Sequence, residues 1–316
     1  MSDRKLTLLL ATALFLVSAP EIAKAELTSG YLQVDGIQRH FLFHVPAALD
    51  SPAPLVFILH GHGATAALTM GENARAAPYR RWLHIAEREN LVLVIPDGSI
   101  GPNGMQGWND CRMDAFSNPS TDDVKFISQI ISSFSQQGYI DPLRVYVTGT
   151  SNGGQMALRL AMELPNQIAA AAPVGAAMAA RNECATPKPK PILFCNGTAD
   201  PILPYQGGRI PGFGRGTIFS VEDSVQFWVN LNQLSPQAAI QSYPDLDSGD
   251  SSTVDGFSYG LNQKNSVEFL RVEGGGHTDP SLTEQYSSIY LKAVGPQNHD
   301  VELAEYTWFF FQDKTL

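Results

Sequence analysis

The sequence predicts an α/β protein with a mostly parallel central sheet and helices on both faces of that sheet. Short continuous apolar runs such as PLVFIL and LVLVI show no alternation with polar residues, which is typical of strands covered on both faces. Stretches with apolar residues at helical spacing lie between such runs along the chain. This alternation indicates parallel strands joined by right-handed helical crossovers.

The elements follow one another in a regular order. The segment 38–45 alternates apolar and polar residues as an early strand, and Asp122-Asp123 places a carboxylate where it can cap the helix VKFISQIISSF. In chain order, the other expected elements are strands 54–59, 91–95 and 145–147, helix 153–164, strands 168–174 and 192–195, helix 221–231, strand 266–272 and a last helix near 301–311. The sequence contains no internal repeat and no linker rich in Ser, Pro and Thr. We therefore expect a single catalytic domain over residues 26–316.

Composition limits the classes of partner. The chain has 316 residues, of which 44% are hydrophobic and 16% charged, so it can bury a large core. The formal net charge is −10, whereas nucleic acids and anionic membrane surfaces are bound by clustered Lys and Arg. We expect a neutral or apolar small-molecule or oligomeric substrate, with no nucleic acid and no obligate protein partner.

The N-terminus has the features of a secretory signal peptide over residues 1–25. A charged start, Ser2-Asp3-Arg4-Lys5, precedes the apolar run LTLLLATALFLVSA and the small-x-small signal Ala23-Lys24-Ala25. The alternative is an uncleaved anchor, but the run is shorter than the roughly 20 residues that span a bilayer. The mature protein is expected to be secreted, either extracellular or periplasmic, and outside the membrane.

The chain contains three cysteines, and an oxidising compartment favours pairing two of them. Cys195 lies in the apolar run PILFCNG and is expected to be a buried thiol. Cys111 and Cys184 lie in polar loop-like stretches, so a bridge between them is a hypothesis. No cysteine pair has CxxC spacing and the histidines are scattered, so neither a metal site nor a cofactor is predicted.

The segment VYVTGTSNGGQMALRLA contains the pattern G-x-S-x-G between a strand and a helix. This context is typical of a nucleophile elbow, a sharp turn that lifts the hydroxyl of Ser151 clear of the sheet. Gly149 and Gly153 avoid side chains where the strand and helix come closest, and the helix dipole favours negative charge at its start. The alternative is that Ser151 merely caps the helix.

A serine hydroxyl needs a base and an orienting acid, which in this arrangement follow the serine in the order acid, then histidine. Asp200 follows the strand 192–195, and His277 lies in the glycine-rich loop GGGHTDP after the strand 266–272. Alternatively, Asp200 could only form a turn before Pro201, His277 could be an ordinary loop histidine, and Asp279 competes as the acid.

The loop HGHG follows the second apolar strand, where a backbone N–H can reach a developing oxyanion. We predict the N–H groups of His62 and Asn152 as the two donors. Gly61 and Gly63 are expected to shape this loop beside the substrate, the alternative being a plain glycine-rich turn.

With these residues in view, the chain resembles the secreted polyhydroxybutyrate depolymerase-like and feruloyl esterase-like enzymes of the α/β-hydrolase fold. The resemblance covers nearly the whole mature chain. It is carried by VDGIQRHFLFHVP, PLVFILHGHGA, IPDG, GWND, DDVKFISQII, RVYVTGTSNGGQMA, NGTADPILPYQGG, GGGHTDP and HDVELAEYTWFFF. It implies ester hydrolysis through an acyl-serine, with Ser151, Asp200 and His277 as the triad. It also suggests that Trp108 lines the acyl pocket.

Two positions depart from the family pattern. Relatives often have a run of glycines where this chain has His62, and many have a tryptophan where it has Asp279, which places a carboxylate near the substrate. Extracellular polymer depolymerases commonly add a linker and a polymer-binding domain, so a soluble hydroxyalkanoate oligomer or related ester is the expected substrate. The alternatives are a feruloyl or acetyl xylan esterase, a serine peptidase and a non-catalytic binding module.

Overall fold

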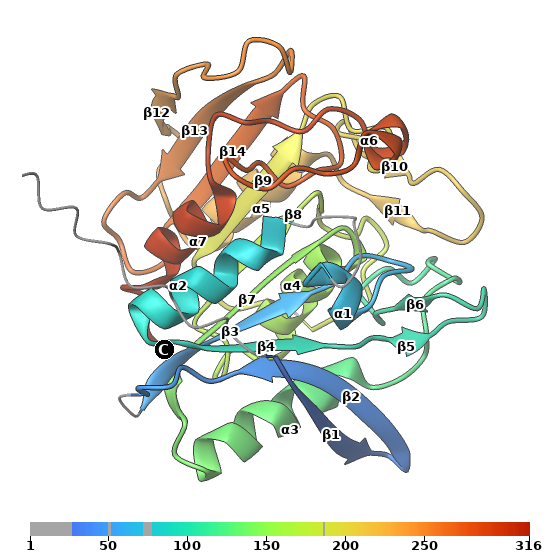
Figure 1. Cartoon of the computed structure of the whole chain (residues 1–316). Coiled ribbons are helices and arrows are strands. Elements are labelled where there is room, and N and C mark those ends of the chain that lie inside the picture. Colours follow the sequence, from blue (N-terminus) through green and yellow to red (C-terminus); the bar gives the residue numbers. More distant parts are fainter. Residues whose placement is uncertain (1–26, 50–51, 72–77, 186) are drawn as a thin grey trace, which may run out of the picture.

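A computed structural model describes residues 27–49, 52–71, 78–185 and 187–316. The predicted signal peptide lies outside these described residues. The described residues form a ten-stranded sheet flanked by helices (Figure 1). The strand order is β1-β2-β4-β3-β7-β8-β9-β14-β13-β12. These strands are β1 (Thr28–Val34), β2 (Ile37–His44), β3 (Ala53–Leu59), β4 (Val92–Pro96), β7 (Ile140–Thr150), β8 (Ala170–Val174), β9 (Ile192–Gly197), β12 (Ala239–Ser242), β13 (Thr253–Tyr259) and β14 (Val267–Glu273).

The centre of the sheet is parallel, as the sequence predicts. Strands β4, β3, β7, β8, β9 and β14 pair in parallel, whereas β1 and β2 on one side and β12 and β13 on the other add antiparallel edges. Because neighbouring parallel strands run in the same direction, their carboxyl ends lie at one edge of the sheet. The loops after β3, β7, β9 and β14 therefore meet at that edge, where ligands bind in open α/β sheets.

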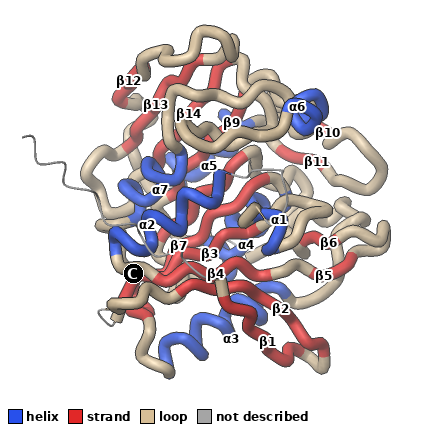
Figure 2. Tube along the Cα trace, viewed as in Figure 1, coloured by secondary structure: helices blue, strands red, loops and turns tan. Residues whose placement is uncertain are grey.

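Helices cover both faces of the sheet (Figure 2). They are α1 (Ala66–Thr69), the short 3₁₀ helix η1 (Pro78–Arg80), α2 (Arg81–Glu89), α3 (Asp123–Gln136), α4 (Asn152–Glu163), α5 (Val221–Leu231), α6 (Ser288–Val294) and α7 (Leu303–Phe311). Two short ribbons, β5 (Ser99–Ile100) with β6 (Gln106–Gly107) and β10 (Gly208–Arg209) with β11 (Thr217–Ile218), extend from the loops.

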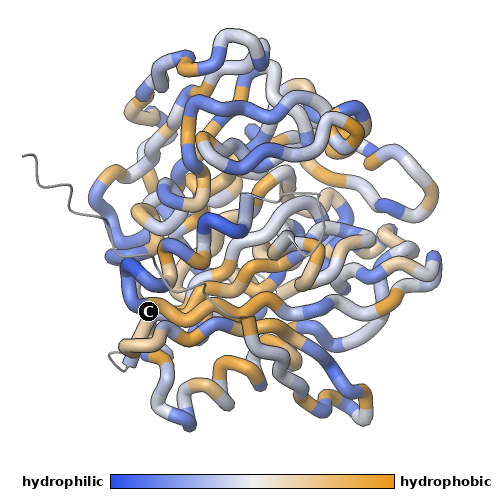
Figure 3. The backbone as a smooth tube through the Cα atoms, viewed as in Figure 1, coloured by the Kyte–Doolittle hydropathy of each residue, from blue (hydrophilic) through white to orange (hydrophobic). Residues whose placement is uncertain are grey.

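The core consists of two apolar layers, one on each face of the sheet. In β3, Leu55 and Phe57 belong to the layer under α3, α4 and α5, whereas Val56 belongs to the layer under α2 and α7. The hydropathy colouring shows the central strands as the most apolar part of the backbone (Figure 3). This arrangement explains why the central strands lack alternation in the sequence.

The structure confirms the Cys111–Cys184 bridge, with Cα atoms 5.2 Å apart, and Cys195 is a buried free thiol. Within the part of the chain that is described, no helix is both long enough and apolar enough to cross a bilayer.

Candidate active site

Ser151 occupies a strained turn between β7 and α4. Its φ of 59° and ψ of −122° lie in a region that residues other than glycine rarely adopt. The backbone N–H of Ser151 donates to the carbonyl of Val174 at 2.9 Å, which ties the turn to β8. The Ser151 side chain makes no capping hydrogen bond to α4. The hydroxyl is therefore not used as a helix cap.

The two glycines of the elbow stand where no side chain fits. A Cβ on Gly149 would lie 2.5 Å from the carbonyl oxygen of Leu59, and one on Gly153 would lie 2.2 Å from the same atom. Both distances are far below van der Waals contact with backbone, which cannot move aside. The close approach of β3, β7 and α4 therefore requires both glycines.

His277 and Asp200 lie together at the ends of β14 and β9. Nδ1 of His277 is 2.5 Å from Oδ2 of Asp200, and the other carboxylate oxygen accepts the backbone N–H groups of Ile202 and Leu203, both at 2.7 Å. Since Nδ1 faces a carboxylate, it carries the proton and leaves Nε2 as an acceptor. Nε2 is buried and has no hydrogen-bond partner among the described residues.

Two cavities meet at Ser151. The larger, of about 370 Å³, is lined by Ser151 and His277 together with the loop 61–64 and the side chains of Tyr79, Tyr286 and Tyr290. The smaller, of about 30 Å³, adjoins the larger one and shares with it His62, Ser151, Ile202 and Arg215. An ester bound with its carbonyl at Ser151 can therefore place one substituent in each cavity.

The loop after β3 carries His62, one of the two predicted oxyanion donors. The N–H of Gly63 donates to Gln106 at 2.7 Å and that of Ala64 to Gly61 at 3.1 Å, so these two are already used. The His60 ring holds the loop, because its Nε2 accepts the N–H of Gly98 and its Nδ1 donates to the carbonyl of Gly61. Burial lowers the pKa of His60, consistent with this neutral form.

Gly61, His62 and Gly63 all line the larger cavity. Gly63 has a φ of +78°, which favours glycine at this turn. Asn152, the other predicted donor, begins α4 immediately after Ser151 and lines the smaller cavity.

The prediction that Trp108 lines the acyl pocket is wrong. Trp108 is completely buried and lines neither cavity at Ser151. Its indole N–H donates to the carbonyl of His60 at 2.9 Å, and its backbone N–H donates to Oδ1 of Asn152 at 2.7 Å. Trp108 therefore connects the two segments that carry the predicted oxyanion donors instead of contacting substrate.

Asp279 does not replace Asp200 as the partner of His277. Its buried carboxylate accepts hydroxyls from Thr150 at 2.8 Å, Tyr286 at 2.8 Å and Tyr79 at 3.0 Å. Burial raises the pKa of Asp279, and these hydrogen bonds act against that shift. Tyr79 and Tyr286 belong to no sequence motif, and only the fold brings them to the site.

A family model for phospholipases and carboxylesterases matches residues 42–211, more than half of the chain. The chain belongs to this family. The fold and the family together show an esterase of the α/β-hydrolase type. Among curated proteins, the chain is 26% identical over 87% of its length to NocK of Nocardia uniformis subsp. tsuyamanensis, whose name describes an esterase, and covers 80% of that protein.

Other relatives carry more specific names. The chain is 27% identical over 81% of its length to the bifunctional acetylxylan esterase/xylanase XynS20E of Neocallimastix patriciarum, and 26% identical over 75% to the poly(3-hydroxyalkanoate) depolymerase C of Paucimonas lemoignei. It spans only 33% and 58% of these two proteins. A solved acetyl xylan esterase from Aspergillus awamori shares the fold, with a TM-score of 0.55 at 13% identity over 79% of this chain and 94% of that one.

Proposed function

We propose that the protein is a secreted serine esterase in which Ser151 is the nucleophile, His277 the general base and Asp200 the residue that orients His277. The observation that carries this proposal is the buried His277 ring. Its Nδ1 is held by Asp200 at 2.5 Å, while its Nε2 lacks a partner and both His277 and Ser151 line one cavity. A base in this state can accept the proton of the serine hydroxyl.

The reaction runs in two halves. His277 takes the Ser151 proton as the hydroxyl attacks the ester carbonyl, the N–H groups of His62 and Asn152 stabilise the oxyanion, and His277 then protonates the leaving alcohol. Water repeats the same steps on the acyl-serine and releases the acid. The positive end of α4 lies at the same point and adds to the stabilisation of negative charge.

Hydroxyalkanoate oligomers or related soluble esters are the proposed substrates. The named poly(3-hydroxyalkanoate) depolymerase relative supports this class. A second candidate is a feruloyl or acetyl xylan ester, which the acetylxylan esterase/xylanase relative supports. The three tyrosines along the larger cavity also favour an aromatic acyl group such as feruloyl, because aromatic rings pack well against one another.

A panel of esters tests this proposal. The mature protein is assayed with 4-nitrophenyl acetate, butyrate and octanoate, methyl ferulate, hydroxybutyrate oligomers, acetylated xylan and a peptide anilide. We expect ester hydrolysis by the wild type and a loss of about 10⁴-fold or more in kcat for Ser151→Ala, since removing the nucleophile leaves only binding and oxyanion stabilisation. Ser132→Ala, an exposed serine on α3, is the matched control and should keep full activity.

The preferred substrate then decides between the two ester classes, and cleavage of the anilide alone would indicate a peptidase. Equal inactivity of the wild type and Ser151→Ala would contradict the proposal and favour a non-catalytic binding module.

A further inference from the structure

The smaller cavity beside Ser151 is lined by hydrogen-bond donors that lack acceptors. Gln155 is 4% exposed and its Nε2 has no partner among the described residues. Asn118 Nδ2 is also buried without a partner in this part of the molecule. Because an unpartnered buried N–H costs free energy, these two N–H groups are available to a ligand that brings acceptor oxygens into the cavity.

The charge at this cavity is positive. Two arginines line it, but the guanidinium of Arg112 is neutralised by Asp110, with nitrogen to oxygen distances of 2.9 and 2.5 Å. Arg215 forms no ion pair with a carboxylate among the described residues. The net result is one uncompensated guanidinium, and the N-terminus of α4 adds positive potential of the same sign.

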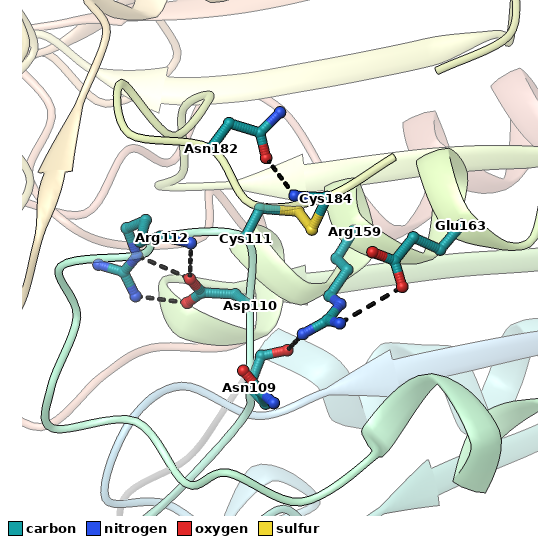
Figure 4. Close-up of a disulfide and its surroundings, with 8 residues drawn as sticks. All are labelled: Asn109, Asp110, Cys111, Arg112, Arg159, Glu163, Asn182 and Cys184. Atoms are coloured by element: carbon teal, nitrogen blue, oxygen red, sulfur yellow. Dashed lines mark hydrogen bonds and ion pairs between the residues drawn. A yellow bond between two sulfur atoms is a disulfide. The ribbon is translucent and has the colours of Figure 1, made fainter. Parts of the chain in front are cut away.

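The walls of the cavity are fixed. Nη1 of Arg112 donates to the backbone carbonyl of Arg215 at 2.6 Å, so one arginine positions the segment that carries the other. The Cys111–Cys184 disulfide ties the residue next to Arg112 to a separate loop (Figure 4). A cavity of about 30 Å³ with rigid walls suits a small group rather than a long chain.

Resting on the proposed esterase function, we propose that this cavity is a subsite for a carboxylate carried by the ester substrate. Gln155 and Asn118 donate to the carboxylate oxygens, and Arg215 supplies the opposite charge. The carboxylate takes no part in the chemistry, and it fixes the ester carbonyl at Ser151. The substrate class is therefore esters with a free acid, such as the end of a hydroxyacid oligomer or the monoester of a dicarboxylic acid.

Paired substrates test this subsite and show which side of the ester carries the acid. The 3-hydroxybutyrate dimer, whose free carboxylate lies on the alcohol side of the ester, is compared with its uncharged terminal amide. Monoethyl succinate, whose free carboxylate lies on the acyl side of the ester, is compared with the uncharged ethyl succinamate. We expect wild-type kcat/KM to be at least tenfold higher for the acid in one of these pairs, mainly through KM, and this preference to shrink at high salt.

Variants test the residues of the subsite, of which Arg215 lines both cavities whereas Gln155 lines only the smaller one and so locates the preference there. Arg215→Gln should reduce the acid-to-amide ratio by about tenfold, Gln155→Met should reduce it several-fold, and Arg215→Lys should restore part of it. Arg209→Gln is the matched control, because Arg209 is exposed on β10 and lines neither cavity. Circular dichroism melting curves confirm that each variant is folded.

Three results would overturn the subsite. The first is equal hydrolysis of acid and amide in both pairs, and the second is an acid preference that Arg215→Gln leaves intact. The third is no hydrolysis of either acid while 4-nitrophenyl butyrate is cleaved, in which case the esterase proposal stands without the subsite. Inactivity toward every ester, including 4-nitrophenyl butyrate, would contradict both proposals together.

Discussion

At the scale of single residues, the position of His277 depends on a glycine in another loop. Gly175 follows β8 with a φ of +52°, and a Cβ placed on it would lie 3.0 Å from Nδ1 and Cε1 of His277. We predict that Gly175→Ala pushes the ring away from Asp200 and lowers kcat/KM by about ten- to a hundredfold, because small misplacements of a base are costly. Steady-state kinetics with 4-nitrophenyl butyrate measures the change.

The matched control separates this steric effect from backbone strain. Gly138 also has a positive φ, +76°, but a Cβ there meets nothing within 4 Å. Both alanine variants should lose about 1–2 kcal/mol of stability from the left-handed conformation, whereas only Gly175→Ala should lose activity. Equal activity in the two variants would show that the ring has room to adjust.

At the scale of elements, the Cys111–Cys184 bridge joins two loops that also pair through their backbones at Arg112 and Asn182. Around it, the backbone N–H of Met113 donates to Arg181 and that of Glu183 donates to Cys111. The bridge closes a loop with a sequence separation of 73 residues. We expect Cys111→Ala/Cys184→Ala to lower the free energy of unfolding by about 2–4 kcal/mol, measured by urea denaturation.

The control for this variant is Cys195→Ala, which removes the buried free thiol and keeps the bridge. A reductant should destabilise the wild type and Cys195→Ala but leave the double variant unchanged. The same unfolding midpoint for the wild type and the double variant would show that the loops are held without the bridge.

Elements with strong local signals were predicted well from the sequence. Helix α5 has the predicted bounds, Val221–Leu231, because Ser220 caps it and its apolar residues follow helical spacing. Strand β12 was missed because all of its residues are exposed, so no apolar pattern marks it. Within the described residues, β12 is defined by its pairing with β13, and a sequence pattern does not contain that register.

In the candidate site, too, some residues have a local sequence signal and others do not. The strand-turn-helix context of Ser151 and the loops of Asp200 and His277 carry local signals. The bonding of Trp108 to the His60 carbonyl does not, since a tryptophan in a loop pattern can face either substrate or core. Arg215 and Gln155 come from separate segments, and only the fold brings them to one cavity.

At the scale of the whole molecule, stability is coupled to pH through groups buried at the carboxyl edge of the sheet. Burial lowers the pKa of His60 below its usual 6.5, whereas burial raises the pKa of Asp279. On acidification, the two pKa shifts change the free energy of unfolding in opposite directions. As pH falls, the unfolded chain protonates His60 before the folded chain does, which destabilises the folded state. The folded chain protonates Asp279 before the unfolded chain does, which stabilises the folded state.

The contribution of His60 can be isolated by comparing slopes. As pH falls below about 6.5, His60 should destabilise the wild type by up to about 1.4 kcal/mol per pH unit until the lowered pKa of the folded state is reached.

His60→Gln should be less stable at pH 7.5, because the bonds to Gly98 and Gly61 are altered, but should lose less stability between pH 7 and 5. His84→Gln, an exposed histidine on α2, is the control and should keep the wild-type slope. Urea denaturation at each pH gives these slopes, and identical slopes for the wild type and His60→Gln would mean that the folded chain protonates His60 as readily as the unfolded chain does.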